Sequence, residues 1–378
     1  MPILASRFHP PAFLRNGHIQ TILPVLLPRR LSIAFERERL ELEDGDFLDL
    51  DWARMGGDKL AILSHGLEGR SDDGYNRGMA TALQAAGWDA LAWNLRGCGK
   101  EINRLPRFYH SGETGDLGAV IRFAATKYWR IALIGFSLGG NLTLKYLGEA
   151  SPHPAVIGAV AISVPIDLAA SAQVLDQRWS NRIYLRRFIK SLIAKVEAKA
   201  LRFPDQVDAS RSRAIRTFLE FDDRYTAPIH GFRDAADYWK KSSARQYLDR
   251  ITIPTLLLNA CNDPFLTPEC FPFAEAEQNS CLFFEAPESG AIWDLLIWPA
   301  AASRGPNSVL LSFLRRPCLQ FRISARSVVV NFPKAPGFEI RGPGCRWFRR
   351  NHGDEAENEC SDRQSASRPR MRSANVKQ

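Results

Sequence analysis

The 378-residue sequence has no long apolar run and no paired cysteines, and each absence excludes a class of protein. No stretch approaches the roughly eighteen apolar residues that a membrane-spanning helix needs. The N-terminus lacks a basic region followed by an apolar one, so we expect no secretory signal peptide. The seven cysteines form no C-x-x-C pair, which argues against a zinc site and a disulfide framework. Reduced thiols and a cytoplasmic location are therefore expected.

Cofactor-binding patterns are missing as well. Gly97-Cys98-Gly99 follows a predicted strand, but Ile102 stands where a dinucleotide-binding fingerprint needs its third glycine. No Walker phosphate loop occurs, and no His, Cys and Asp cluster has the spacing of metal ligands. We expect no cofactor and no metal.

The positive charge is unevenly distributed. The formal net charge is +9, yet residues 291–378 hold 15 Lys and Arg against 7 Asp and Glu, so the rest of the chain is nearly neutral. A basic tail is compatible with a nucleic-acid or membrane arm. It is equally the composition of GC-rich DNA translated out of frame. We expect no nucleic-acid partner, while peripheral contact with a membrane stays open.

Strand and helix patterns alternate through most of the chain. A hairpin is predicted over 31–42 and 47–53 because the turn-like 43–46 separates two β-prone runs. Further strands are predicted at 59–64, 88–93, 130–136, 155–164, 255–259 and 281–285. Helices are predicted at 75–86, 113–128 and 138–149. This order indicates an α/β fold with a mostly parallel, doubly wound sheet and helices on both faces.

Four regions follow from the pattern. Residues 1–30 are proline-rich and predicted to be irregular, and 31–290 are predicted to form the α/β domain. Within it, 167–250 interrupts the alternation with helical segments and is predicted to be a cap over the sheet's binding edge. Residues 291–378 form an atypical basic tail that is predicted to be partly disordered.

Ser137 stands at the centre of Gly-Phe-Ser-Leu-Gly, between a predicted strand and a predicted helix. A G-x-S-x-G turn at this position places a serine on a strained strand-to-helix connection and exposes its hydroxyl above the sheet. The Leu138 N–H at the helix N-terminus is a candidate oxyanion donor. The second candidate is the Leu67 N–H, in the loop after an earlier strand. His65 in that loop is expected to shape it through hydrogen bonds.

A serine nucleophile needs a base that a carboxylate orients. In enzymes with this turn the acid follows the serine and the histidine comes last. Asp263 follows the predicted strand 255–259 and is the candidate acid, although an aspartate at such a turn can also be a simple cap.

The sequence also resembles the YheT-like hydrolases of the α/β-hydrolase superfamily over about residues 8–290. The resemblance rests on 16–21 (NGHIQT), 65–69 (HGLEG), 94–99 (NLRGCG), 108–112 (FYHSG), 135–141 (GFSLGGN) and 262–265 (NDPF). It implies an α/β-hydrolase fold and a serine esterase acting on short or medium acyl chains of a small-molecule ester. It also implies that a triad histidine follows Gly290.

No histidine stands at that place. Of the seven histidines only His352 follows Asp263, and it lies in the atypical tail without a strand before it. Three explanations fit: a frameshift near codons 289–291, a catalytically inactive binding protein, or an active enzyme with a relocated base. Our prediction from sequence is therefore a carboxylic-ester hydrolase whose activity depends on a base that only His352 offers in the expected chain order.

Overall fold

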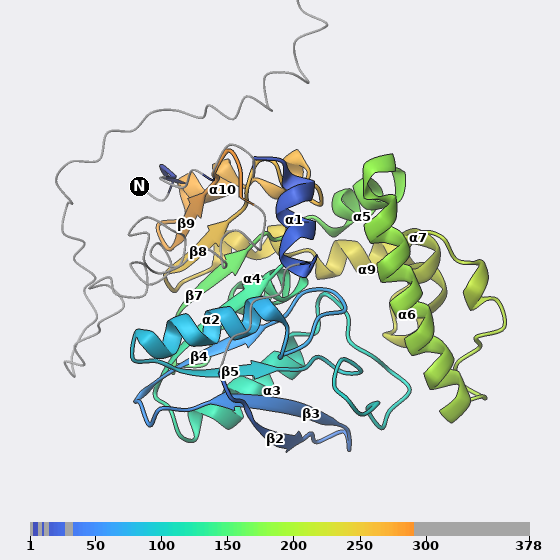
Figure 1. Cartoon of the computed structure of the whole chain (residues 1–378), viewed down its shortest axis with the longest axis horizontal. Helices are drawn as coiled ribbons and strands as arrows, with labels where there is room; N and C mark the ends of the chain where they lie inside the picture. The colour runs from blue at the N-terminus through green and yellow to red at the C-terminus, as the bar shows by residue number, and fades with distance from the viewer. Residues whose placement is uncertain (1–2, 7–9, 11–14, 27–32, 291–378) are drawn as a thin grey trace, which may run out of the picture. The chain divides into compact units, whose positions relative to one another are not determined.

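A nine-stranded sheet organises the computed structural model, in the order β1-β9-β8-β7-β6-β4-β5-β3-β2 (Figure 1). The structure describes residues 3–6, 10, 15–26 and 33–290. The strands are β1 Ile3–Leu4, β2 Glu36–Glu41, β3 Phe47–Ala53, β4 Lys59–Ser64, β5 Asp89–Trp93, β6 Arg130–Phe136, β7 Val156–Ile162, β8 Thr255–Leu258 and β9 Leu282–Glu285. All described pairings are parallel except those of β3 with β2 and with β5. The predicted hairpin and mostly parallel sheet are confirmed.

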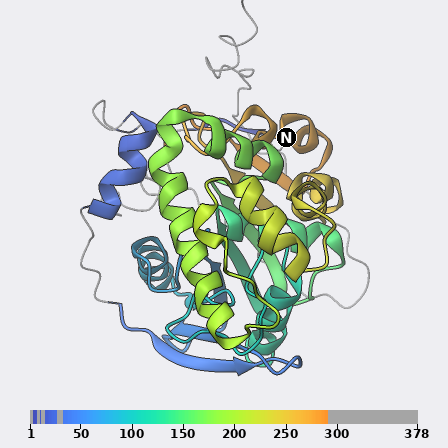
Figure 2. The ribbon, with the colours of Figure 1, turned by 90° about the vertical axis from the view of Figure 1, so that its right-hand side faces the viewer.

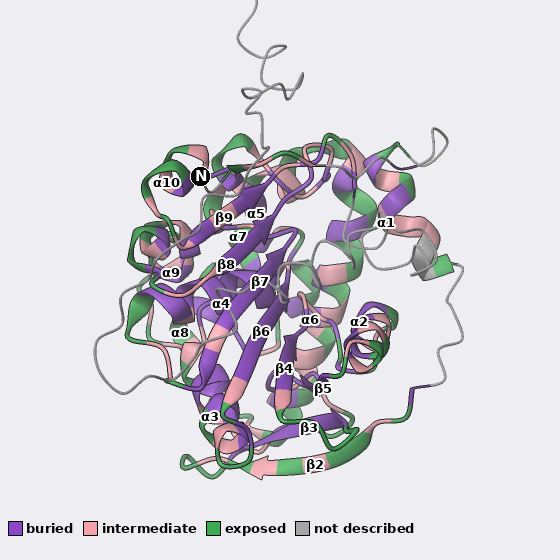
Figure 3. Ribbon diagram, turned by 90° about the vertical axis from the view of Figure 1, so that its left-hand side faces the viewer, coloured by how far each residue is buried: buried purple, intermediate pink, exposed green. Residues whose placement is uncertain are grey.

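Helices cover both faces of this sheet (Figure 3), and successive strand residues belong to the core clusters on opposite faces. Leu60 and Ile62 of β4 pack with α3 (Thr114–Ala125) and α4 (Leu138–Glu149). Their neighbours Ala61 and Leu63 pack with α2 (Gly74–Ala85) on the opposite face. Strands buried on both sides read as continuous apolar runs, which is why the sequence pattern found them.

Between β7 and β8 the chain forms a helical segment, which we call the cap (Figure 2). Its own apolar core is centred on Leu185, Ile189 and Phe221. Its elements are α5 Leu168–Gln177, η2 Trp179–Asn181, α6 Arg182–Arg202, η3 Ser212–Ala214, α7 Phe218–Phe221, η4 Asp222–Thr226, α8 Ala227–Ile229, α9 Ala235–Ser242 and η5 Ala244–Arg250. After β8 come η6 Pro268–Cys270 and α10 Phe273–Gln278.

The N-terminal segment differs from the irregular stretch expected over 1–30, because it contains helix α1 (Gly17–Leu26). The Asn16 side chain accepts hydrogen bonds from the His18 and Ile19 N–H groups at 2.9 and 3.2 Å. Such a cap satisfies donors that a helix N-terminus otherwise leaves free. Strand β1 was also not predicted, since two residues carry no readable period.

A buried ion network anchors the hairpin to the domain. Arg96, 3% exposed, donates to both carboxylate oxygens of Asp116 on α3 at 2.8 and 2.7 Å. It also donates at 3.0 Å to Asp46, a fully buried carboxylate in the turn before β3. Burial raises the pKa of Asp116, against the effect of Arg96. Arg96 therefore neutralises carboxylates that the fold has removed from water.

Replacing Arg96 by methionine should lower the free energy of unfolding by about 3–5 kcal/mol, because it leaves the buried Asp46 without an ion-pair partner and Asp116 with only Arg107, at 3.7 Å. Urea denaturation at pH 7 measures the change. Arg213→Met is the matched control, since the Arg213 side chain is 86% exposed, and it should leave the midpoint nearly unchanged. Equal losses in the two variants would contradict the assigned role of Arg96.

Candidate active site

Ser137 adopts a backbone conformation that side-chain-bearing residues rarely occupy, with φ +51° and ψ −115°. It lies between the end of β6 and the start of α4, and its N–H donates to the Ile162 carbonyl of β7 at 2.9 Å. A non-glycine residue in this region costs about 1–3 kcal/mol unless its surroundings hold it. The strain predicted for this turn from its sequence is present.

The two flanking glycines explain how this turn is held. A Cβ added to Gly135 would lie 2.3 Å from the Gly139 carbonyl oxygen, and one added to Gly139 would lie 2.3 Å from the Ser64 carbonyl oxygen. Both distances are shorter than any real Cβ contact. The strand, the helix and the neighbouring strand β4 therefore approach so closely that only glycine fits on either side of Ser137.

The loop after β4 lies against this serine. A Cβ on Gly66 would come within 3.3 Å of the Ser137 Cβ. The N–H groups of Leu67 and Leu138 donate to no acceptor among the described residues. Leu138 is also the first residue of α4, where the helix dipole favours negative charge. The structure thus brings both predicted oxyanion donors to the neighbourhood of the serine.

His65 is fixed by hydrogen bonds on both ring nitrogens. Its Nδ1 donates to the Gly66 carbonyl at 2.7 Å, and its Nε2 accepts from the Leu95 N–H at 3.1 Å. Full burial lowers the pKa of His65 to about 4. A neutral ring with both nitrogens engaged cannot serve as the base, so its role is to shape the loop, as its position in the sequence suggested.

A second set of contacts to this loop was not foreseen from the sequence. Glu68 has φ +55°, and its carboxylate accepts from Tyr109 at 2.8 Å, from Lys195 at 2.7 Å and from Ser191. Lys195 and Ser191 belong to α6 of the cap. The pKa of Glu68 is lowered, since Lys195 and its other donors outweigh burial. The cap therefore holds the residue that follows Leu67.

Asp263 follows β8, where the acid was expected, and is buried. One carboxylate oxygen accepts from the Ser163 hydroxyl and the other from the Phe265 N–H at 3.0 Å. Burial raises the pKa of Asp263 to about 6 against these two hydrogen bonds. None of the histidines that the structure describes hydrogen-bonds to it.

The serine and the acid lie at the same edge of the sheet. Ser137 follows β6 and Asp263 follows β8, with β7 between them. Adjacent strands are about 4.8 Å apart, so the ends of β6 and β8 that carry the two loops are separated by about 10 Å. His352, the only candidate base in the expected chain order, lies outside the described residues.

Helix α1 packs on the acid loop. A Cβ on Gly17 would lie 2.1 Å from the Asn262 carbonyl oxygen, and the Asn262 side chain donates to the Arg15 carbonyl at 2.9 Å and to Gln20 at 3.0 Å. Asn262 also accepts from the Gly290 N–H at 3.1 Å. The residue that precedes the expected histidine position is thus bound to the residue that precedes Asp263.

His18 contacts the cap from α1. Its ring lies nearly parallel to Tyr184 of α6, with centroids 5.8 Å apart, and its Nδ1 is 3.2 Å from the tyrosine hydroxyl. Tyr184 in turn packs edge-on against Phe265, beside Asp263, at 4.9 Å. Burial lowers the pKa of His18. His18 therefore contacts the cap near the acid loop. It lies in the 16–21 (NGHIQT) motif and precedes Ser137, so it does not stand where the triad histidine is expected in chain order.

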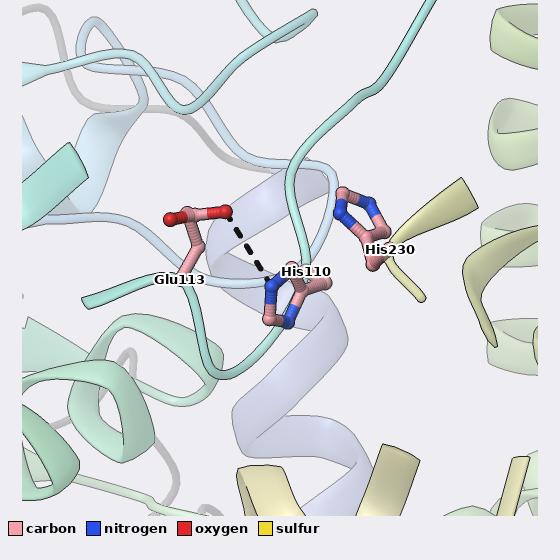
Figure 4. Close-up of side chains that lie close together, drawn as sticks. All are labelled: His110, Glu113 and His230. Carbon is pink, nitrogen blue, oxygen red and sulfur yellow. Dashed lines mark ion pairs between the residues drawn. The ribbon is translucent and has the colours of Figure 1, made fainter. Parts of the chain in front are cut away.

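Three side chains elsewhere lie close enough to suggest a metal site: His110, Glu113 and His230, with ligand atoms within 4.8 Å of one another (Figure 4). The hydrogen bond made by His110 argues against that use. His110 Nδ1 accepts from the Gly112 N–H at 3.1 Å, so its Nε2 carries the proton and faces Glu113 at 3.5 Å. A protonated nitrogen cannot bind a metal. Burial lowers the pKa of His230 to about 3, and we assign the three residues to contact between cap and loop.

The buried acid makes a pH-dependent prediction. Because the pKa of Asp263 rises from 3.8 to about 6 on folding, the folded state keeps a proton that the unfolded chain releases, and stability falls as pH rises through this window. Asp263→Asn should remove that loss. Its free energy of unfolding relative to the unchanged protein should rise by about 1 kcal/mol from pH 5 to pH 8.

Urea denaturation at both pH values measures this difference. Asp249→Asn, at a carboxylate whose side chain is 74% exposed, is the control and should give the same difference at both values. A pH-independent result for Asp263→Asn would mean that a base already pairs with the acid in the folded protein.

Comparison with known proteins identifies the family of this chain. The family model described as alpha/beta hydrolase fold matches residues 61–284. Putative esterase YheT of Escherichia coli is 35% identical over 280 residues, covering 72% of this chain and 82% of that protein. Phospholipase ABHD3 of Mus musculus is 26% identical over 289 residues, covering 74% and 70%.

Among solved structures, the esterase Pf2001 of Pyrococcus furiosus matches with a TM-score of 0.54 at 19% identity, covering 75% of this chain and 92% of that one. This likeness shows the fold alone. The family model and the similarity to the Escherichia coli protein show the family. With its strained serine turn and parallel sheet, the chain belongs to the α/β-hydrolase superfamily and, within it, to the YheT-like hydrolases.

Proposed function

We propose that this hydrolase is built for carboxylic-ester hydrolysis through an acyl-enzyme at Ser137. The observation that carries the proposal is the strained Ser137 turn, with the N–H groups of Leu67 and Leu138 free of acceptors within the described part of the chain. The substrate class is a small-molecule ester with a short or medium acyl chain. We propose a cytoplasmic location. Among the described residues, no helix could span a membrane.

The reaction would proceed in two halves. The Ser137 oxygen attacks the acyl carbonyl, its proton passes to a base, and the two N–H groups hold the negative oxygen of the tetrahedral intermediate. The carbon–oxygen bond to the alcohol then breaks, and the base returns the proton to the departing alkoxide. Water releases the acid by the same steps, which regenerates the serine hydroxyl.

This reaction scheme requires a general base. Asp263 would orient a histidine, but the sequence offers only His352 after it. Without a base the turnover of a serine triad falls by several orders of magnitude, because its members act as a unit. The missing histidine therefore favours a second candidate function, an inactive hydrolase fold that binds an acyl ligand. A frameshift after Gly290 remains the third explanation.

Added imidazole separates these functions. If Ser137, the oxyanion donors and Asp263 are intact and only the base is missing, free imidazole should raise the Ser137-dependent hydrolysis of p-nitrophenyl acetate by on the order of 10²-fold. The rate of the Ser137→Ala variant at the same imidazole concentration is subtracted, because imidazole itself cleaves this ester. Asp263→Ala should reduce the gain, since nothing then orients the added base.

Two other outcomes of this experiment are informative. Turnover that is lost in Ser137→Ala but does not respond to imidazole indicates a base already within the chain, and His352→Ala then identifies or dismisses His352. Equal rates for the unchanged protein and Ser137→Ala at every imidazole concentration contradict the esterase proposal and leave the binding role. Sequencing across codons 285–300, with translation of all three frames, tests the frameshift independently.

A further inference from the structure

We propose that the outer face of the cap helix α6, with η2 before it, docks this protein on an anionic lipid bilayer. We call this surface the basic face. It consists of exposed residues of these two elements and of Arg178, which directly precedes η2: Arg178, Trp179, Arg182, Ile183, Arg186, Arg187 and Lys190.

The spacing of these residues puts them on one side of the helix. Positions 179, 182, 183, 186, 187 and 190 recur every three or four residues, which is the period of one helical face. The opposite side holds Tyr184, Leu185, Ile189 and Leu192, all buried in the cap. The inner side of α6 is therefore apolar, whereas the outer side of η2 and α6 combines cations with two large apolar side chains, Trp179 and Ile183.

The cations of the basic face form no ion pair with any residue that the structure describes. No acidic residue occurs between Asp176 and Glu197. Three other arginines of the cap are paired with acidic residues. Arg213 pairs with Glu197 at 2.7 Å, Arg224 with Asp208 at 3.0 Å and Arg233 with Asp234 at 2.8 Å. Five cations without an ion pair in the described part of the chain call for an anionic partner.

The apolar groups on this face decide which anionic partner fits. Trp179 is 81% exposed and Ile183, one turn later, is 66% exposed. Helix α1, which touches α6 through His18 and Tyr184, also exposes Ile19 and Leu26, at 45% and 68%. A nucleic acid would satisfy the cations but would leave isoleucine and leucine in water. A bilayer supplies anionic headgroups for the cations and an acyl layer for the apolar groups, with tryptophan favoured at the boundary.

The inner side of the same helix reaches the candidate active site. Tyr184 packs on Phe265 beside the acid loop, and Lys195 holds Glu68 beside the oxyanion loop. A bilayer bound at the basic face would therefore lie one helix away from both catalytic loops. This consequence, which rests on the proposed function, assigns the substrate class as esters held in or near a membrane.

Vesicle sedimentation with the full-length chain tests the docking surface. Vesicles of phosphatidylcholine with phosphatidylglycerol should bind the protein, and vesicles of phosphatidylcholine alone should bind it weakly. Replacing Arg182, Arg186 and Arg187 by glutamine should lower the partition coefficient by about fivefold per cation, or about one hundredfold in all. Trp179→Ala with Ile183→Ala should lower it by about tenfold.

Matched variants control for total charge and for exposed apolar area. Glutamine at Arg213, Arg224 and Arg233 removes the same charge from the same cap, and Leu201→Ala with Leu219→Ala removes apolar groups that are 90% and 48% exposed. Both controls should bind nearly as the unchanged protein does. The basic tail is identical in every variant and gives a constant background.

The proposal fails if the triple glutamine variant binds as tightly as the unchanged protein, since the tail alone would then account for binding. It also fails if test and control variants lose affinity equally, or if the triple variant loses affinity for an RNA oligonucleotide but not for vesicles. Ser137→Ala must bind vesicles unchanged. Vesicle binding is measured without hydrolysis, so its outcome is separate from that of the esterase proposal.

Discussion

The close approach of β6, β4 and α4 around Ser137 is the constraint on which the rest of the site depends. Gly135 and Gly139 allow backbone to meet backbone where no side chain fits, and the serine is thereby forced into its left-handed conformation. Its strain is tolerated because both flanking elements are buried in the sheet and cannot relax separately. The Leu138 N–H and the loop at Gly66 can take part in the proposed chemistry because Ser137 is held in this one position.

Much of this could be predicted from the sequence because the signals are local. The β6 and α4 bounds agree residue for residue with the predicted 130–136 and 138–149, since a buried parallel strand and its following helix have distinct periods. Asp263 was placed correctly after β8 by chain order alone. Residues whose roles depend on distant partners were not found. Lys195 looks like one more cation of a basic helix until the fold brings it to Glu68.

The charged side chains on the inner and outer sides of the cap differ in how they are paired. Buried charge on the cap's inner side is paired with the loops beside the serine, whereas the cations on its outer side are left to solvent within the described chain. Burial without pairing is costly, so the inner contacts had to be complementary. The outer ones carry no such requirement. Because the exposed outer cations cost the fold little free energy, they are available to bind a partner. The same helix thus carries buried charges that hold the fold together and exposed charges that can bind a ligand.

Asn262 joins segments that are far apart in the chain, binding Arg15 and Gln20 across some 240 residues and Gly290 across 28. During synthesis, α1 is made first and has no acid loop to pack on until almost the whole domain has emerged. Contacts of such long sequence separation form late, because the closure of the intervening chain must come first. The acid loop is therefore among the last parts of the site to assemble, and the N-terminal segment, far from Ser137 in sequence, completes it.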